Sequence, residues 1–376
     1  MSHHSKGKNE EDWSIRLIKV VSFMVVFMAG AVLGLSLTSH ITPYFHTQSE
    51  LFFPKRMYST NCAKDNTSLA SFVSPSNLMH DMSDDELFWR ASLVPKKEKF
   101  PFKRVPKVAF MFMTRGALPL LKLWEMFFAG HEGFYSIYVH SLPGYKLIVN
   151  DSSPFYGRQI RSEETSWGSI SLVDAEKRLL ANALLDFSNE RFVLISESCI
   201  PVFNFPNVYN YLVNSIHSFV ESYDEDSPRG RGRYSRRMWP DIKLSKWRKG
   251  SEWFELNREL AVNIVADFKY YNLFRKYCKP SCYPDEHYIP TYLNMFYGAL
   301  NSNRTVTWVD WSRGGPHPAR YGHRAITEEF IQSIRENATL CSYNFEETSM
   351  CYLFARKFAP SALEPLLRLA STLMEF

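Results

Sequence analysis

The stretch Val108-Ala-Phe-Met-Phe-Met113 is a run of six apolar residues that ends at the polar Thr114. A short apolar run of this kind is typical of a strand buried on both faces of a sheet. Similar runs and helical patterns then alternate along the chain: strands at 134–140 and 192–196, and helices at 119–129, 172–186 and 208–219. This alternation predicts an α/β domain in which helices flank a mainly parallel, mixed sheet.

In such a sheet, ligands bind beyond the carboxyl ends of the strands. The segments at these ends are Thr114-Arg115-Gly116, His140-Ser141 and Ser196-Glu197-Ser198. None contains the Gly-x-Gly-x-x-Gly fingerprint of dinucleotide sites or the lysine loop of P-loop nucleotide sites. Dinucleotide and ATP chemistry are therefore disfavoured, and nucleotide-sugar chemistry is the class that remains.

Composition excludes several other classes of protein. The 376 residues are 45% hydrophobic, 15% aromatic and 22% charged, which disfavours intrinsic disorder and a multi-span membrane protein. The formal net charge of +5 is too small for this length to indicate nucleic-acid binding by itself.

Residues 20–37 carry no charge and form the one run that approaches the ~20 residues needed to span a bilayer. Lys6, Lys8, Arg16 and Lys19 precede this run, and the next basic residue is Lys55. The positive-inside rule then predicts a cytoplasmic tail at 1–19, a signal anchor at 20–37 and a luminal remainder. A cleaved signal peptide is the alternative, although its apolar core usually has roughly 7–15 residues.

The luminal part divides into a stem at 38–104, which is rich in polar residues and ends in a Lys- and Pro-rich segment, and a compact domain at 105–376. All six cysteines lie on the luminal side, where up to three disulfides are expected: Cys62, Cys199, Cys278, Cys282, Cys341 and Cys351. A zinc site at Cys278 and Cys282 is disfavoured because no matching second pair follows. Four glycosylation sequons share this side: Asn66, Asn150, Asn303 and Asn337.

Five motifs occur in order along the domain: Val108–Thr114, Trp167-Gly168 with Ser171–Ala181, Leu194–Pro201, Tyr283-Pro-Asp-Glu286 and Leu353-Phe-Ala-Arg-Lys-Phe358. Together they resemble the core-2/I-branching β-1,6-N-acetylglucosaminyltransferase family, and its plant-type branch best. The resemblance implies a single-pass type II protein of the Golgi membrane with a GT-A-like fold. It also implies sugar transfer from a UDP-sugar with inversion, without the Asp-x-Asp metal site of most GT-A enzymes.

The resemblance assigns the catalytic base to Glu286, since inverting transfer needs a carboxylate to take the proton of the acceptor hydroxyl. Pro284 suits the first turn of a helix, which would place Asp285 and Glu286 at the positive helix end, where carboxylates stay ionised. Neighbouring helical residues point about 100° apart, so one of the two is expected to cap the helix and the other to reach the cleft. The alternative is that both acids merely stabilise the helix start.

Basic side chains are expected to offset the negative charge on the departing UDP. The resemblance assigns this role to Lys357, with Arg335 as a companion. In a strand over 351–358, Arg356 would share a face with Tyr352 and Phe354 while Lys357 points the other way. Thr114 and Arg115 are expected near the nucleotide base, but His140 stands where animal members carry an acid.

Acceptor contacts are predicted less specifically. From Arg229 to Lys249 there are nine Lys or Arg and one acid, interleaved with aromatic residues, a mixture that suits sugar faces and acidic saccharides. The alternative is a solvated basic loop. The candidates are Glu197, Arg233, Arg236, Arg237, Trp308 and Trp311.

Two features leave other chemistry open. Asp224-Glu225-Asp226 has the Asp-x-Asp form, so Mn²⁺ dependence is an alternative to the metal-independent mechanism.

The donor sugar is N-acetylglucosamine, xylose or glucuronic acid, and the acceptor is a glycan or glycoprotein. Competing functions are a non-catalytic saccharide-binding scaffold and, more weakly, a sulfotransferase, whereas nucleic acid is excluded by the luminal location.

Overall fold

The computed structural model describes residues 19–33, 69–75, 77–93, 100, 102–279, 281–336 and 339–376. The chain divides into two compact units, Met1–Asp65 and Asn66–Phe376. In the first unit, residues 19–33 are helical. None of the helices in these ranges has both the length and the apolar character required to cross a bilayer. Several predictions fall outside the described residues: the tail up to residue 18, anchor positions 34–37, Cys62, Asn66 and Asn337.

A four-stranded sheet with the order β2-β1-β3-β5 forms the centre of the second unit. Its strands are β1 (Lys107–Met113), β2 (Tyr135–His140), β3 (Asn189–Ser196) and β5 (Glu255–Asn257). β1 pairs in parallel with β2 and β3, and β5 runs antiparallel to β3. The apolar runs are buried, as a strand covered on both faces requires. The predicted mixed, mainly parallel sheet is therefore confirmed.

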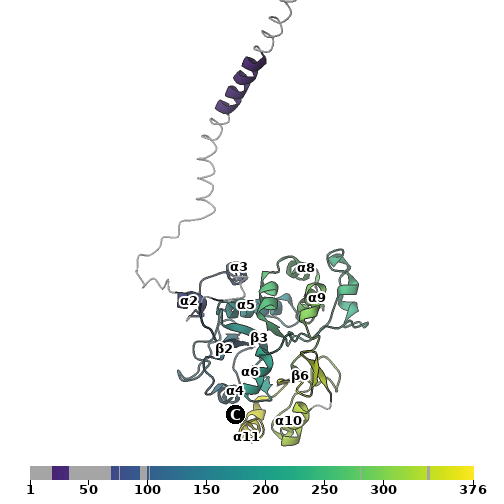
Figure 1. Ribbon diagram of the computed structural model, residues 1–376. Coiled ribbons are helices and arrows are strands. Elements are labelled where there is room, and N and C mark those ends of the chain that lie inside the picture. Colours follow the sequence, from purple (N-terminus) through teal and green to yellow (C-terminus); the bar gives the residue numbers. More distant parts are fainter. Residues whose placement is uncertain are drawn as a thin grey trace, which may run out of the picture. The chain divides into compact units, whose positions relative to one another are not determined.

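Helices cover both faces of this sheet. α5 (Ile170–Leu184) lies on one side of the strands, and α4 (Leu121–Phe128) and α6 (Phe205–Val213) lie on the other (Figure 1). Side-chain caps define two helix starts: Ser169 accepts a hydrogen bond from the amide of Ser171, and Asn204 accepts one from that of Asn207. α6 therefore begins at Phe205 and ends at Val213, short of the predicted Phe219.

A second sheet, of order β4-β9-β6, holds the C-terminal motif. It consists of β4 (Ile200–Pro201), β6 (Thr307–Val309) and β9 (Phe354–Arg356). β9 runs antiparallel to β4, which follows β3 after a short turn, and parallel to β6. This pairing links the end of the central sheet to the segment that carries Lys357. The other helices are α7 (Arg258–Ala266), α8 (Lys269–Tyr277), α9 (Pro284–Phe296), α10 (Glu328–Arg335) and α11 (Leu363–Thr372).

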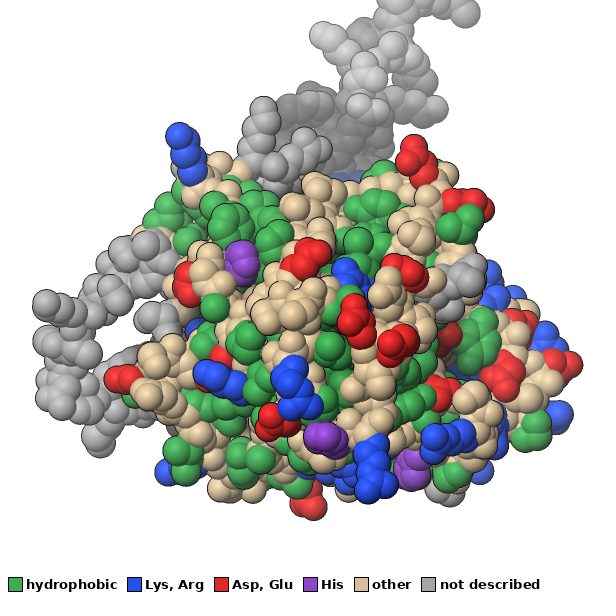
Figure 2. Space-filling model, turned by 90° about the horizontal axis from the view of Figure 1, so that it is seen from below, with side chains coloured by type: hydrophobic (Ala, Val, Ile, Leu, Met, Phe, Trp, Pro, Cys, Tyr) green, Lys and Arg blue, Asp and Glu red, His purple; other side chains and the backbone are tan. Residues whose placement is uncertain are grey.

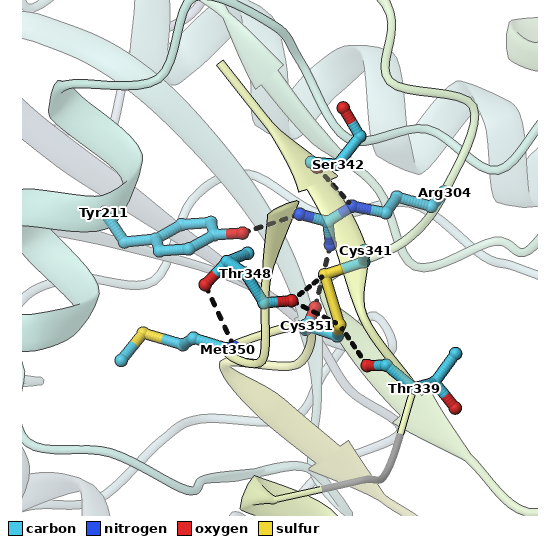
Figure 3. The surroundings of a disulfide bond; sticks show 8 residues. All are labelled: Tyr211, Arg304, Thr339, Cys341, Ser342, Thr348, Met350 and Cys351. Carbon is cyan, nitrogen blue, oxygen red and sulfur yellow. Dashed lines mark hydrogen bonds between the residues drawn. A yellow bond between two sulfur atoms is a disulfide. The ribbon is translucent and has the colours of Figure 1, made fainter. Parts of the chain in front are cut away.

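Arg304 anchors the hairpin of β7 (Cys341–Tyr343) and β8 (Glu346–Thr348) to the body. Its guanidinium donates to the carbonyl of Cys351 over 2.8 Å, to that of Ser342 over 3.2 Å and to the Tyr211 hydroxyl over 2.6 Å (Figure 3). The disulfide Cys341–Cys351 closes the same hairpin. One arginine thus satisfies two loop carbonyls and connects them to α6.

The cysteines form two disulfides within the described residues, Cys278–Cys282 and Cys341–Cys351. The first pair rules out the zinc alternative at these positions. Cys199, between β3 and β4, is a buried thiol without a disulfide partner among the described residues, and Cys62 lies outside them, so the expectation of up to three bridges stays a prediction. The side chains of Asn150 and Asn303 are exposed, as a glycosylation site requires.

The compact unit begins earlier than the predicted boundary at residue 105. α2 (Leu69–Val73) and α3 (Asp84–Ser92) precede β1, and Leu87 and Ala91 of α3 are buried in the core. Asp84 forms a bidentate pair with Arg178 of α5 over 2.6–2.7 Å. Residues 69–75 and 77–93 are therefore part of the folded body and not of the stem.

Charges of both signs are interspersed with hydrophobic and polar side chains on the face shown in Figure 2. On that face, the net charge of +5 is not gathered into one basic patch. Charge must therefore be judged locally, at the individual site.

Candidate active site

The N-terminus of α9 carries the predicted catalytic acid. Tyr283 precedes the helix in the left-handed conformation, with φ 52°, and Pro284 occupies the first turn, so Glu286 is the third helical residue. Gly168 lies against Tyr283, since an added Cβ would come within 2.9 Å of the Tyr283 ring. The neighbouring Trp167 ring is 5.0 Å from that of Tyr283. The Trp167-Gly168 motif therefore packs beside the start of α9.

Two cations hold one oxygen of Glu286. Oε2 accepts a hydrogen bond from Arg233 over 2.6 Å and lies 3.4 Å from the Lys249 ammonium. The Arg233 guanidinium also lies 4.1 Å from the centre of the Tyr283 ring. Among the described residues, no group donates a hydrogen bond to Oε1, and the side chain is 26% exposed. Glu286 thus presents one fixed oxygen and one open oxygen.

The ionisation of Asp285 differs from what its place at the helix start predicts. It is buried, and loss of hydration together with the nearby Glu252 and Glu286 raises its pKa well above the usual value. Glu176 of α5 is fully buried, and its pKa is likewise raised by loss of hydration and by Glu252 and Asp285. Neither oxygen of Glu176 has a hydrogen-bond partner among the described residues, so a neutral carboxylic acid is the favoured form. The prediction that both helix-start acids stay ionised is wrong for Asp285.

Residues 250–253 connect the base to the C-terminal motif. The Gly250 amide donates to the Glu286 carbonyl over 2.9 Å, and the Trp253 ring centre lies 4.0 Å from the Arg356 guanidinium. Glu252 lies between these contacts. Loss of hydration and the nearby Glu286 raise its pKa to about 7, although Arg356 and Lys357 oppose the shift. Glu286 and Lys357 therefore both lie close enough to Glu252 to affect the pKa of its half-buried carboxyl.

Lys357 belongs to a group of cations. Partial loss of hydration and the nearby Arg356, Arg115 and Arg320 lower its pKa, whereas Glu197 raises it. Arg115 follows β1 and Glu197 follows β3, so the carboxyl end of the central sheet meets the end of β9 here. β9 covers only three residues and ends at Arg356, so the alternation predicted over 351–358 does not extend to Lys357.

Arg335 makes its contacts away from Lys357. Its side chain donates to the carbonyl of Leu373 and lies 4.6 Å from the Phe203 ring centre, contacts that join α10 to the end of α11. Arg320, which was not predicted from the sequence, lies near Lys357 and contributes with Arg356 and Arg115 to its lowered pKa. It is held there because the next residue, Tyr321, donates its amide to the Lys357 carbonyl over 2.9 Å. No sequence pattern around Arg320 predicts this pairing.

The groups that follow β1 and β2 have internal partners. The Thr114 hydroxyl contacts the carbonyls of Gly116 and His140, over 3.2 Å and 3.4 Å. The buried His140 ring contacts Arg178 over 3.1 Å, and loss of hydration together with Arg178 lowers its pKa to about 3. Thr114 therefore shapes the turn, and His140 is neutral.

The basic stretch at 229–249 is folded rather than a free loop. Trp247 is buried, stacks 4.5 Å from the His287 ring and donates to the Gly230 carbonyl over 3.1 Å. This packing positions Arg233 and Lys249 at Glu286. Arg236 and Arg237 are exposed on the surface, and their side chains form no hydrogen bond, ion pair or cation–π contact with other described residues.

The two candidate tryptophans differ. Trp308 packs with Tyr321 and Phe330, each with ring centres 6.0 Å away, so it is mainly a packing residue. Trp311 is 51% exposed. His317, from the same loop, lies 5.7 Å from the Trp167 ring and so adds to the aromatic surface beside Tyr283.

The possible metal motif forms ion pairs with an arginine. Arg231 binds Asp224 through two 2.8 Å hydrogen bonds and lies 3.5 Å from Asp226. These contacts occupy the carboxylates that would hold Mn²⁺. Metal-independent transfer stays a prediction.

Comparison with known proteins agrees with this geometry. The family model described as "Core-2/I-Branching enzyme" matches residues 108–335, which include Glu286, Arg233 and Lys249. A similar protein is Glycosyltransferase BC10 from rice, Oryza sativa subsp. japonica, at 36% identity over 310 residues, covering 70% of this chain and 76% of the relative. The chain therefore belongs to the core-2/I-branching enzyme family and is a glycosyltransferase.

Proposed function

We propose that this glycosyltransferase inverts the anomeric centre of a UDP-sugar and uses Glu286 as its base. The acceptor hydroxyl gives its proton to Oε1, while its oxygen forms a bond to the anomeric carbon. The bond from that carbon to the phosphate oxygen breaks, and UDP departs with the electron pair. Arg233 and Lys249 hold Oε2, which keeps the carboxylate oriented and leaves Oε1 for the acceptor.

On the donor side, Lys357 offsets the charge that develops on the leaving pyrophosphate, and Arg115 and Arg320 add to the same field. Partial loss of hydration and the nearby Arg356, Arg115 and Arg320 lower the pKa of Lys357, and one acid, Glu197, opposes them. The departing UDP, which gains one negative charge as its bond to the anomeric carbon breaks, supplies the missing negative charge. Fixed cations can thereby take the role that a divalent metal has in other transferases.

The observation that carries this proposal is the link through residues 250–253. One end of this segment is hydrogen-bonded to Glu286 and the other end packs on Arg356, the residue before Lys357. A single displacement requires a base at the attacking oxygen and cations at the leaving oxygen, because these two oxygens lie on opposite sides of the same carbon. The short segment 250–253 has one of these groups at each end.

We also propose that the enzyme acts in the Golgi lumen as a single-pass type II protein with a GT-A-like fold. The two disulfides support an oxidising compartment. The apolar run at 20–37 with its basic flank supports the anchor. The acceptor is a glycan or glycoprotein, and the donor is UDP-linked N-acetylglucosamine, xylose or glucuronic acid.

The test is UDP release by the full-length chain over a panel of these donors, with neutral and acidic oligosaccharides as acceptors and with EDTA or Mn²⁺ present. Acceptor-dependent release from one donor that persists in EDTA is expected. Release that requires Mn²⁺ would overturn the fixed-cation mechanism. A product with retained anomeric configuration, read from its NMR coupling constants, would overturn the single displacement.

A further inference from the structure

A cavity of about 490 Å³ is lined in part by Arg233, which binds Glu286, and by Tyr283, which precedes the helix of Glu286. Small-molecule sites usually have volumes of about 300–1,000 Å³, so this cavity can hold a small saccharide unit. It is lined by three cationic and three tyrosine side chains: Arg229, Arg233, Lys279, Tyr234, Tyr277 and Tyr283. Its location is fixed relative to the base, because Arg233 also donates to Oε2 of Glu286.

The charge of this lining is one-sided. The described residues that line the cavity include no aspartate or glutamate. Arg233 pairs with Glu286, whereas within the described part of the chain no carboxylate lies within 4 Å of the charged nitrogens of Arg229 or Lys279. Two cations therefore face the same space without counter-charge from the protein.

Parts of the wall are held in place by contacts within the protein. The disulfide Cys278–Cys282 closes the loop that carries Lys279. The Tyr234 hydroxyl donates to the Ile242 carbonyl over 2.6 Å, and Tyr283 is packed between Arg233 and Trp167. A preformed wall loses little conformational entropy when a ligand binds.

We propose that this cavity binds an anionic sugar residue of the acceptor, a carboxylated or sulfated unit adjacent to the sugar whose hydroxyl faces Glu286. Arginine forks and ammonium groups bind carboxylate or sulfate oxygens through charge-assisted hydrogen bonds. Tyrosine rings offer apolar faces to the C–H groups of a pyranose. This inference rests on the proposed function and names the acceptor class of the same site.

The test compares binding to the full-length chain by titration calorimetry at low salt. The probes are an oligosaccharide with a terminal uronic acid, its methyl ester and a sulfated counterpart. The ester keeps the shape of the acid and removes the charge. Because a hydrogen bond to a charged group contributes about 1.5–3 kcal/mol, the acid or the sulfate is expected to bind about 10-fold or more tightly than the ester. Which of the two anions gains affinity identifies the natural group.

Arg229→Ala and Lys279→Ala are each expected to remove most of that difference. Lys243→Ala deletes an exposed cation of the same basic stretch that does not line the cavity, and it should leave the difference intact. Equal affinity for acid, sulfate and ester, or a difference that survives both cavity substitutions, overturns the inference. Binding needs no turnover, so a failure of the proposed transfer reaction is seen separately in the UDP-release assay.

Discussion

Arg233 donates to Glu286 Oε2 over 2.6 Å while its guanidinium lies 4.1 Å from the ring centre of Tyr283, the residue that precedes the helix of Glu286. The stacking and the ion pair fix the same guanidinium from two directions. The carboxylate thereby keeps one orientation, and its second oxygen accepts no hydrogen bond from the described residues. This relationship joins the basic stretch at 229–249, the start of α9 and the proposed base in one unit.

Glu286→Gln is expected to reduce kcat by about 10²–10⁴-fold, because the amide cannot accept the acceptor proton. The amide retains the shape of the side chain, so KM for the donor and the thermal unfolding temperature should change little. Initial rates of UDP release measure the effect. Asp285→Asn is the matched control on the neighbouring residue, since Asp285 is buried and its raised pKa favours the neutral form. Retained activity in Glu286→Gln would move the base elsewhere.

Lys357→Ala is expected to lower kcat by about 10²–10³-fold, the usual loss when one group that stabilises the developing charge is removed. Arg335→Ala should instead lower stability and leave kcat near the wild-type value, because Arg335 binds the Leu373 carbonyl and Phe203. Steady-state kinetics and thermal unfolding of both variants separate the two effects. A large loss of kcat in Arg335→Ala with unchanged stability would restore the pairing that the sequence suggests.

Local patterns predicted three strands of the central sheet, β1, β2 and β3, and the start of α9, but not the short strand β5. Apolar runs indicate buried strands from chemistry within a few residues, and Pro284 at the first turn marks a helix start in the same way. The bounds of β1 and β2 each lie within one residue of the predicted runs. The helix of Glu286 begins at Pro284, as predicted.

The predictions that were wrong depend on contacts between distant segments. The ionisation of Asp285 is decided by burial and by Glu252, which lies 33 residues earlier in the chain. Arg320, for which no role was predicted, lies near Lys357, whereas Arg335 does not, because α10 packs on the end of α11 while Tyr321 pairs with Lys357. The sequence around α3 is polar and therefore predicted a stem. The burial of Leu87 and Ala91 shows that this segment belongs to the folded domain.

Acidification is expected to destabilise the fold through His287. The ring is buried and stacked on Trp247, and loss of hydration lowers its pKa to about 3 from 6.5. Because the unfolded chain binds the proton first, the stability gained from neutral His287 is complete above pH ~6.5 and is lost as the pH falls toward 3. Between pH 7 and 5 the loss is about 2 kcal/mol.

Urea unfolding at pH 7 and pH 5 measures this loss. His287→Asn should be less stable at pH 7 but should show a smaller decrease on acidification than the wild type. His323→Asn changes an exposed histidine and is the control, expected to follow the wild type at both values. An unchanged decrease in His287→Asn would assign the acid sensitivity to another group, with the buried His140 the first to examine.

Gly250→Ala is expected to damage both the fold and the site, because Gly250 permits the close approach of three segments. An added Cβ would come within 1.8 Å of the Glu221 carbonyl oxygen and 2.9 Å of Pro290 in α9, and backbone atoms cannot yield as a flexible side chain would. Overpacking of this kind typically costs about 1–3 kcal/mol. Since the Gly250 amide also binds the Glu286 carbonyl, kcat should fall together with stability.

Gly298→Ala is the matched control, because an added Cβ there meets nothing within 4 Å. Urea midpoints and UDP-release rates test both variants, and a Gly250→Ala enzyme with wild-type midpoint and rate would show that residues 250–253 do not link Glu286 to the C-terminal motif.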